Sequence, residues 1–205
     1  MERALAAWLL LAVSPVSMVG PTEVIQAAIE QVVRVVQDPD LARPAAAEHR
    51  RVEIRRVAER LFDFPEMARR SLARHWTDRT SQEREEFVRL FTSILERSYF
   101  GKLENFSGER IMYTSEMVDG EYAVVRSKVV TSRRTEIPIE YRLHLVDSRW
   151  AVYDVLIEGV SFVSTYRAQF NRVIQTSSYE GLMAKMRSRD VVEPASLEQN
   201  ARNPN

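Results

Sequence analysis

The chain has 205 residues, equal numbers of acidic and basic side chains (29 of each), and no cysteine. A formal net charge of zero gives no overall attraction to nucleic acid, and the missing cysteines exclude disulfides, thiolate catalysis and cysteine-ligated metals. Hydrophobic residues make up 45% of the chain, which is the composition of one globular domain with a sizeable core.

An apolar stretch follows Met1-Glu2-Arg3 and reads ALAAWLLLAVSPVSMVG. It is about fifteen residues long and ends in small side chains, which is short for a membrane span and typical of a secretory signal peptide. We therefore expect export, with residues 1–20 forming either a signal peptide or an uncleaved N-terminal anchor.

Helical periodicity dominates the first half of the remaining chain. Pro21 begins a helix with a valine- and isoleucine-rich stripe, and a second helix is expected over about 45–61. Asp63 has the position of an N-cap for a short helix that begins near Pro65.

A long helix is predicted after Thr80, which forms a capping box with Glu83. Its apolar side is wide and aromatic, so we expect this helix to be central. The residues of that side are Phe87, Leu90, Phe91, Ile94, Leu95, Tyr99 and Leu103.

After Gly108 the hydrophobic period changes from helical to two, which indicates strands. The alternation is clearest over 135–147, where Ile139, Tyr141 and Leu143 face one way and Arg142 and His144 face the other. Asp-Gly and Asp-Ser pairs mark turns, and the short connections predict an antiparallel meander. The four expected strands cover 110–118, 121–134, 135–147 and 148–159.

Two helices are expected at the end, over about 160–175 and 178–187, the second with a capping box of Ser177 and Glu180. The sequence thus predicts one α+β domain over 21–187, a curved four-stranded antiparallel sheet covered by helices. The polar residues 188–205 are expected to form a disordered tail.

The stretch GVSFVSTYRAQF (159–170) has the strand–glycine–serine–helix order of a hydrolase nucleophile elbow. Val163 stands where the second glycine of that motif is needed, and all three histidines precede Ser161. We therefore interpret Ser161 as a helix cap. Asp154 is an acid within an apolar strand, where a general base and a structural group that caps backbone or pairs with an arginine are alternatives, the structural one favoured.

No set of residues has the spacing of a metal site or a phosphate loop, so no catalytic residue, metal or cofactor is predicted. Residues 43–79 contain ten arginines and six acids. A solvated helical face with local ion pairs explains this run, and an anionic partner is the alternative. Farther on, Val163, Tyr166 and Phe170 share one helix face that Arg167 borders.

Three segments resemble the MlaC family, also known as toluene-tolerance auxiliary proteins, over roughly 22–187. The pattern D-F-x-x-M-A-R-x-x-L-x-x-x-W covers 63–76, a helix with Phe87, Phe91 and Tyr99 follows, and G-V-S-x-V-x-x-Y-R-x-Q-F covers 159–170. The family is the periplasmic phospholipid-binding component of the Mla transport system.

The resemblance implies a sheet related to the nuclear-transport-factor-two-like fold and a deep apolar cavity for acyl chains. It implies a periplasmic, non-enzymatic carrier that exchanges phospholipid with an outer-membrane lipoprotein complex and with the lipid-receiving subunit of an inner-membrane ABC transporter. Such transport maintains the lipid asymmetry of the outer membrane. We expect a monomer that needs no cofactor other than its lipid cargo.

We expect a set of fifteen side chains, named at the end of this paragraph, to bind the lipid. Among them, Arg167 lies at the mouth of the cavity or pairs with Asp154 or Glu158. Two rival functions remain: a cavity enzyme of the same broad fold that uses Asp154 as base, and an adaptor with a solid interior. The predicted lipid-binding residues are Phe91, Ile94, Leu95, Tyr99, Tyr113, Val125, Ile139, Tyr141, Leu143, Tyr153, Val155, Val163, Tyr166, Arg167 and Phe170.

Overall fold

A computed structural model describes residues 19–104, 109–131 and 133–188. The predicted signal or anchor and the predicted tail lie almost wholly outside these residues. In chain order the elements are α1 (Pro21–Gln37), η1 (Pro44–Ala46), α2 (Ala47–Leu61), α3 (Phe64–Leu72), η2 (Ala73–Trp76), α4 (Ser81–Glu104), β1 (Arg110–Asp119), β2 (Tyr122–Val130), β3 (Glu136–Val146), β4 (Arg149–Ile157), β5 (Val160–Ser161), α5 (Phe162–Thr176) and α6 (Tyr179–Ser188).

The strands form one antiparallel sheet in the order β1-β2-β3-β4-β5, which confirms the α+β class. The expected count of four strands is wrong by one. Glu158 and Gly159 both have positive φ angles, 51° and 81°, and turn the chain back so that Val160 and Ser161 pair with the end of β4. A two-residue strand is too short to show alternation, so periodicity could not predict it.

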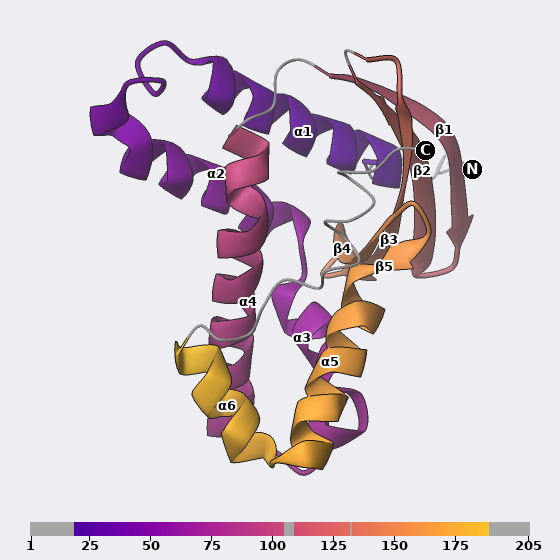
Figure 1. Ribbon diagram of the computed structural model, residues 1–205. Coiled ribbons are helices and arrows are strands. Elements are labelled where there is room, and N and C mark those ends of the chain that lie inside the picture. The colour runs from indigo at the N-terminus through magenta and orange to yellow at the C-terminus, as the bar shows by residue number, and fades with distance from the viewer. Residues whose placement is uncertain (1–18, 105–108, 132, 189–205) are drawn as a thin grey trace, which may run out of the picture.

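The elements form two packed groups (Figure 1). α1 and the end of α2 pack on one face of the sheet, and α3, α4, α5 and α6 form a helical body beside it. The link between α2 and α3 runs along the edge of β4, where Phe62 forms a parallel bridge with Val152. None of the helices in the described ranges combines the length and apolarity that a membrane span needs.

A β-bulge interrupts the pairing of β3 with β4. Leu143 is paired with Val152 and Arg142 with Asp154, so that Tyr153 is the extra residue on β4. Because a bulge inserts one extra residue, the alternation of side chains between the two faces of the sheet is reversed beyond it. It therefore decides which β4 side chains face the interior.

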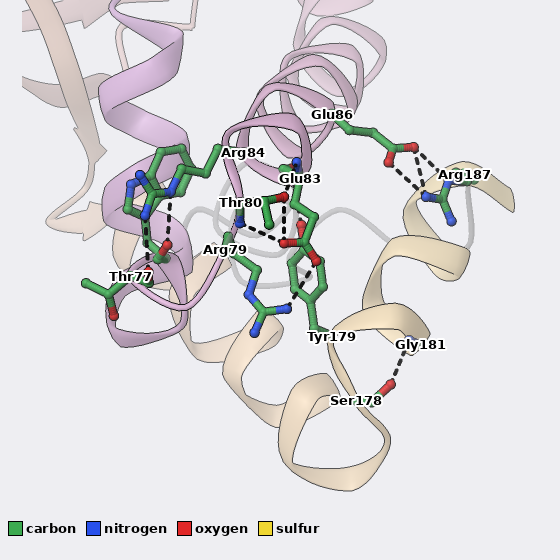
Figure 2. Close-up of polar contacts among 11 residues, drawn as sticks. Thr77, Arg79, Thr80, Glu83, Arg84, Glu86, Ser178, Tyr179, Gly181 and Arg187 are labelled. Atoms are coloured by element: carbon green, nitrogen blue, oxygen red, sulfur yellow. Dashed lines mark hydrogen bonds and ion pairs between the residues drawn. The ribbon is translucent and has the colours of Figure 1, made fainter.

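Two predicted helix caps are confirmed. The Asp63 carboxylate accepts a hydrogen bond from Glu66 N at 2.9 Å, and Thr80 N donates to Glu83 Oε2 at 2.7 Å while Glu83 N donates to Thr80 Oγ1 at 3.2 Å. Figure 2 shows this capping box where α4 begins. Both caps bind backbone N–H groups that the helix itself leaves unpaired.

The predicted capping box of Ser177 and Glu180 is wrong by one residue. α6 begins at Tyr179, and Ser178 is the residue whose Oγ accepts a hydrogen bond, from Gly181 N at 3.1 Å. Figure 2 shows this contact beside Tyr179, whose ring lies under the guanidinium of Arg79. A Cβ at position 181 would lie 2.2 Å from Ser177 Oγ and 3.0 Å from Ser177 Cβ, so a larger residue there would force Ser177 to move.

Candidate lipid-binding site

One group of buried apolar side chains, here called the sheet cluster, lies between α1 and the sheet. Helix α1 contributes Ile25, which is fully buried, and β2 and β3 contribute alternate residues. The alternation predicted for residues 137–145 is confirmed, because Tyr141 and Leu143 face this cluster. Its buried members are Ile25, Leu61, Ala123, Val125, Tyr141, Leu143, Trp150, Val152, Val155 and Phe162.

A second group, the helical cluster, fills the space between α3, α4, α5 and α6. Aromatic rings form its centre: Phe91 packs edge-on against Tyr166 and Phe170, with ring centroids 5.2 and 5.8 Å apart. Such edge-to-face pairs add to the energy of apolar burial. Its buried members are Ala58, Phe64, Met67, Ala68, Leu72, Phe87, Phe91, Ile94, Leu95, Val163, Tyr166, Phe170, Tyr179, Leu182, Met183 and Met186.

The two clusters meet where α4 passes the start of α5. Tyr99 and Phe62 pack against both clusters, and the Tyr99 ring stacks on Phe162 with centroids 4.7 Å apart. Phe162 belongs to the sheet cluster and the next residue, Val163, to the helical cluster. The two clusters are thus in contact with each other through Tyr99 and Phe62.

Two tyrosine hydroxyls lie at the sheet cluster. Burial raises the pKa of Tyr113 to about 12, with smaller contributions from Tyr141 and Glu30. Burial also raises the pKa of Tyr141, and the nearby hydroxyl of the buried Ser127 opposes this effect only in part. Both shifts show that little water reaches these two phenols at the sheet cluster.

A surface groove of about 430 Å³ lies beside the helical cluster, and we call it the arginine groove. It is formed by α3 and η2 on one side, the polar face of β3 and β4 on another, and the first turns of α5 on the third. Val163 connects it with the helical cluster. Its lining residues are Arg69, Arg70, Ala73, Trp76, Thr77, Arg142, Tyr153, Asp154, Val163, Ser164 and Arg167.

The residues predicted to bind lipid fall in all three places. Phe91, Ile94, Leu95, Val163, Tyr166 and Phe170 belong to the helical cluster. The sheet cluster includes or borders Tyr113, Val125, Ile139, Tyr141, Leu143 and Val155. Tyr99 contacts both clusters, and Tyr153 and Arg167 lie in the arginine groove.

The β-bulge explains why Tyr153 lies apart from Val155. Alternation along β4 puts both residues on one face, but the extra residue makes Val152 and Trp150 face the sheet cluster and leaves Tyr153 against α3. Trp150 and Val152, which were not among the predicted lining residues, belong to the sheet cluster for this reason. Ile25 also belongs to the sheet cluster without having been predicted there, although its place in a helical stripe could have indicated that it is buried.

Asp154 and Ser161 have structural roles, as expected. Asp154 Oδ1 accepts a hydrogen bond from Val163 N at 3.1 Å, and its Oδ2 accepts one from Ser161 Oγ at 2.6 Å. Ser161 in turn is the N-cap of α5 and accepts from Ser164 N at 3.0 Å. The arginine beside Asp154 is Arg142, with Nη1 3.8 Å from Oδ2, rather than Arg167.

Most arginines of residues 43–79 have local partners, as a solvated face predicts. Arg43 pairs with Asp40 and Arg56 with Glu53, each three residues away along the chain. Arg69 and Arg70 are different because they also line the groove. Within the described ranges, no group of three or more histidine, aspartate or glutamate side chains is placed to hold a metal ion.

Comparison with known proteins links this geometry to a family. The model of the family described as "MlaC protein" matches residues 26–188. The intermembrane phospholipid transport system binding protein MlaC of Haemophilus influenzae is 22% identical over 120 residues, and the match spans 56% of each chain, about half the length of that relative.

A solved structure of a phospholipid-binding protein from Ralstonia solanacearum, in complex with a phospholipid, is also similar. Its sequence is 25% identical, and the superposition has a TM-score of 0.69. The likeness covers 81% of this chain and 94% of that one.

Proposed function

The chain belongs to the MlaC family, and from this premise we propose that it is a phospholipid carrier that holds acyl chains in its apolar interior. The observation that carries the proposal is the family match over 26–188, which includes every predicted lipid-binding residue. The similar protein from Ralstonia solanacearum was solved with a phospholipid, which supports the same cargo here.

The transport role follows from the energetics of the cargo. Each buried methylene is worth about 0.8 kcal/mol, so exposing two chains of roughly fifteen methylenes each costs on the order of 20 kcal/mol. An apolar interior makes exchange with a membrane close to isoenergetic. The carrier would act in the periplasm, between an outer-membrane lipoprotein complex and an inner-membrane ABC transporter, and so maintain outer-membrane asymmetry. These partners, and the relation to the nuclear-transport-factor-two-like fold, are inferred from the resemblance.

We assign the acyl chains to the sheet cluster. Among the described helices, α1 lies across this cluster, and several apolar side chains at its border, such as Val24 and Ile29, are only half-buried. The helical cluster is instead enclosed by four helices, and rings of α4 and α5 pack edge to face at its centre. Movement of α1 away from the sheet would therefore open an apolar space without unfolding the helical body.

A matched pair of substitutions tests this assignment. Ala123 in the sheet cluster and Ala68 in the helical cluster are both buried, so leucine at either site adds the same volume. Each change costs about 1–3 kcal/mol of stability through overpacking. Ala123→Leu should also lower the phospholipid that co-purifies with the protein, measured by extraction and mass spectrometry, whereas Ala68→Leu should not.

Purified wild-type protein without phospholipid would contradict the carrier function itself. A loss of lipid in Ala68→Leu but not in Ala123→Leu would contradict only the location. The rival enzyme is disfavoured by Asp154, because both of its oxygens accept hydrogen bonds at the start of α5. Turnover of any substrate that is lost in Asp154→Asn would revive it.

A further inference from the structure

The arginine groove brings guanidinium groups from three elements to one surface. Arg69 and Arg70 come from α3, Arg142 from β3 and Arg167 from α5, and Asp154 is the one acid in the lining. Its volume of about 430 Å³ lies within the range of small-molecule sites, roughly 300–1,000 Å³. The groove is therefore large enough for a small anionic group.

On α3, Glu66 pairs with both arginines but does not use all their donors. Its two oxygens accept hydrogen bonds from Arg69 Nε and Nη2 at 2.6 Å, and Arg70 donates only through Nε, at 2.7 Å. Among the described residues no hydrogen bond occupies the terminal nitrogens of Arg70. These nitrogens are free to bind a ligand.

The other two arginines are also incompletely paired. Arg142 donates to Glu140 through Nε at 3.1 Å, and its Nη1 is 3.8 Å from Asp154. Arg167 is exposed, and its contact is a long hydrogen bond of 3.4 Å to Ser164 Oγ. Within the described part of the chain, no carboxylate pairs with Arg167.

Tyr153 gives the groove a fixed wall. The guanidinium carbon of Arg70 lies 4.0 Å from the centre of its ring, a stacking contact that orients the free nitrogens. Burial raises the pKa of Tyr153 above its ordinary value, against the opposing charges of Arg70 and Arg142. Its phenol is therefore a neutral hydrogen-bond donor at neutral pH.

We propose that the arginine groove is a phosphate-binding site, in which Arg70, Arg142 and Arg167 hold a phosphate group. Planar guanidinium groups bind phosphate oxygens through paired, charge-assisted hydrogen bonds, which a lysine cannot reproduce. The phosphate belongs either to a lipid headgroup or to a free phosphate. The first source rests on the proposed function and requires acyl chains in the helical cluster, which borders the groove through Val163, rather than in the sheet cluster. The phosphate chemistry does not depend on either.

Calorimetric titration of the full chain at low salt tests the site with two probes. Glycerophosphoethanolamine is a phosphodiester headgroup without acyl chains, and inorganic phosphate represents the free anion. Arg167→Gln should weaken binding about tenfold, which is the size of one charge-assisted hydrogen bond. Arg167→Lys should restore only part of it. Arg172→Gln, an exposed arginine on the same helix, is the control and should change affinity less than twofold.

Tighter binding of the diester assigns the groove to a headgroup, and equal or tighter binding of inorganic phosphate assigns it to the free anion. No binding of either probe, or binding that Arg167→Gln and Arg70→Gln leave unchanged, overturns the proposal. Lipid extraction from the same samples separates the two hypotheses. If wild type binds neither probe but wild type and the groove variants all keep their phospholipid, the phosphate site is ruled out. The carrier function then stands.

Discussion

The two apolar clusters differ in how they are enclosed. The helical cluster lies between four helices, and aromatic rings of α4 and α5 pack edge to face at its centre. At the surface, α4 and α6 are joined by the ion pair of Glu86 and Arg187, 2.9 Å apart (Figure 2). The sheet cluster is covered mainly by α1, which bonds to β1 through Thr22 and Glu116. This contrast indicates a rigid helical body beside a region that can open.

Truncation of a central ring should have the largest effect on stability. Phe91 is fully buried and contacts the rings of Tyr166 and Phe170. Phe91→Ala should lower the free energy of unfolding by about 3–5 kcal/mol, because it removes a large side chain from a region that cannot collapse around the cavity. Urea denaturation measures this loss, and the folded fraction should keep its phospholipid.

Leu143→Ala is the corresponding change in the sheet cluster. Leu143 is also fully buried, and its truncation should cost about 2–5 kcal/mol if its neighbours cannot relax. A region that opens can relax, so the cost should lie at the lower end of this range and the lipid content should change. The contrast between the clusters is wrong if Phe91→Ala depletes lipid and Leu143→Ala does not.

Local features of both regions could be predicted from the sequence. The caps at Asp63 and Thr80 depend on residues within three positions, and so does the assignment of Ser161 as the N-cap of α5. The same short-range logic failed by one residue at Ser177, because two consecutive serines both fit the cap and only the backbone path selects Ser178. Where two neighbours have the same chemistry, spacing alone cannot choose.

The division into two clusters could not be predicted. Periodicity identifies which side of α4 is apolar, but it does not reveal that Phe91 faces α5 whereas Tyr99 reaches the sheet cluster. The bulge at Tyr153 arises from the pairing of β4 with β3 and leaves no mark in the β4 sequence itself. Groove residues distant in the chain, such as Arg70 and Arg142, meet only through this tertiary arrangement.

The attachment of α1 provides a smaller test. Glu116 Oε2 accepts hydrogen bonds from Thr22 N at 2.8 Å and Thr22 Oγ1 at 2.5 Å, at the N-terminus of α1. Glu116→Ala should therefore cost about 1 kcal/mol, as the loss of a helix cap does. If α1 is the moving cover, the same change should speed lipid transfer to acceptor vesicles several-fold.

The matched control for this prediction is Glu121→Ala, which removes an exposed glutamate from the turn between β1 and β2. It should leave both the unfolding midpoint and the transfer rate unchanged. Equal transfer rates in Glu116→Ala and wild type would show that α1 does not limit exchange, and the sheet cluster would then have to open elsewhere.

Acid pH should destabilise the helical body through Glu66. We expect this to be the smallest of the four effects on stability predicted in this Discussion. Burial of Glu66 works to raise its pKa, but hydrogen bonds and charges from Arg69 and Arg70 outweigh it and lower the pKa below the ordinary value of 4.5. Glu66 therefore stabilises the fold above pH 4.5, and this contribution is lost as pH falls through its lowered folded pKa. Because Arg69 is half exposed, the contribution should stay below about 1 kcal/mol.

Urea midpoints between pH 7 and pH 3 measure this contribution. Glu66→Gln removes it at every pH, so the variant should be less stable than wild type at pH 7 and the difference should shrink as the pH falls. Glu85→Gln, an exposed change on α4, should follow wild type throughout. A constant difference between Glu66→Gln and wild type would mean that the glutamate acts through packing alone. The acid sensitivity of the helical body would then arise at other carboxylates, such as Glu83, whose pKa is lowered by its hydrogen bonds with Thr80.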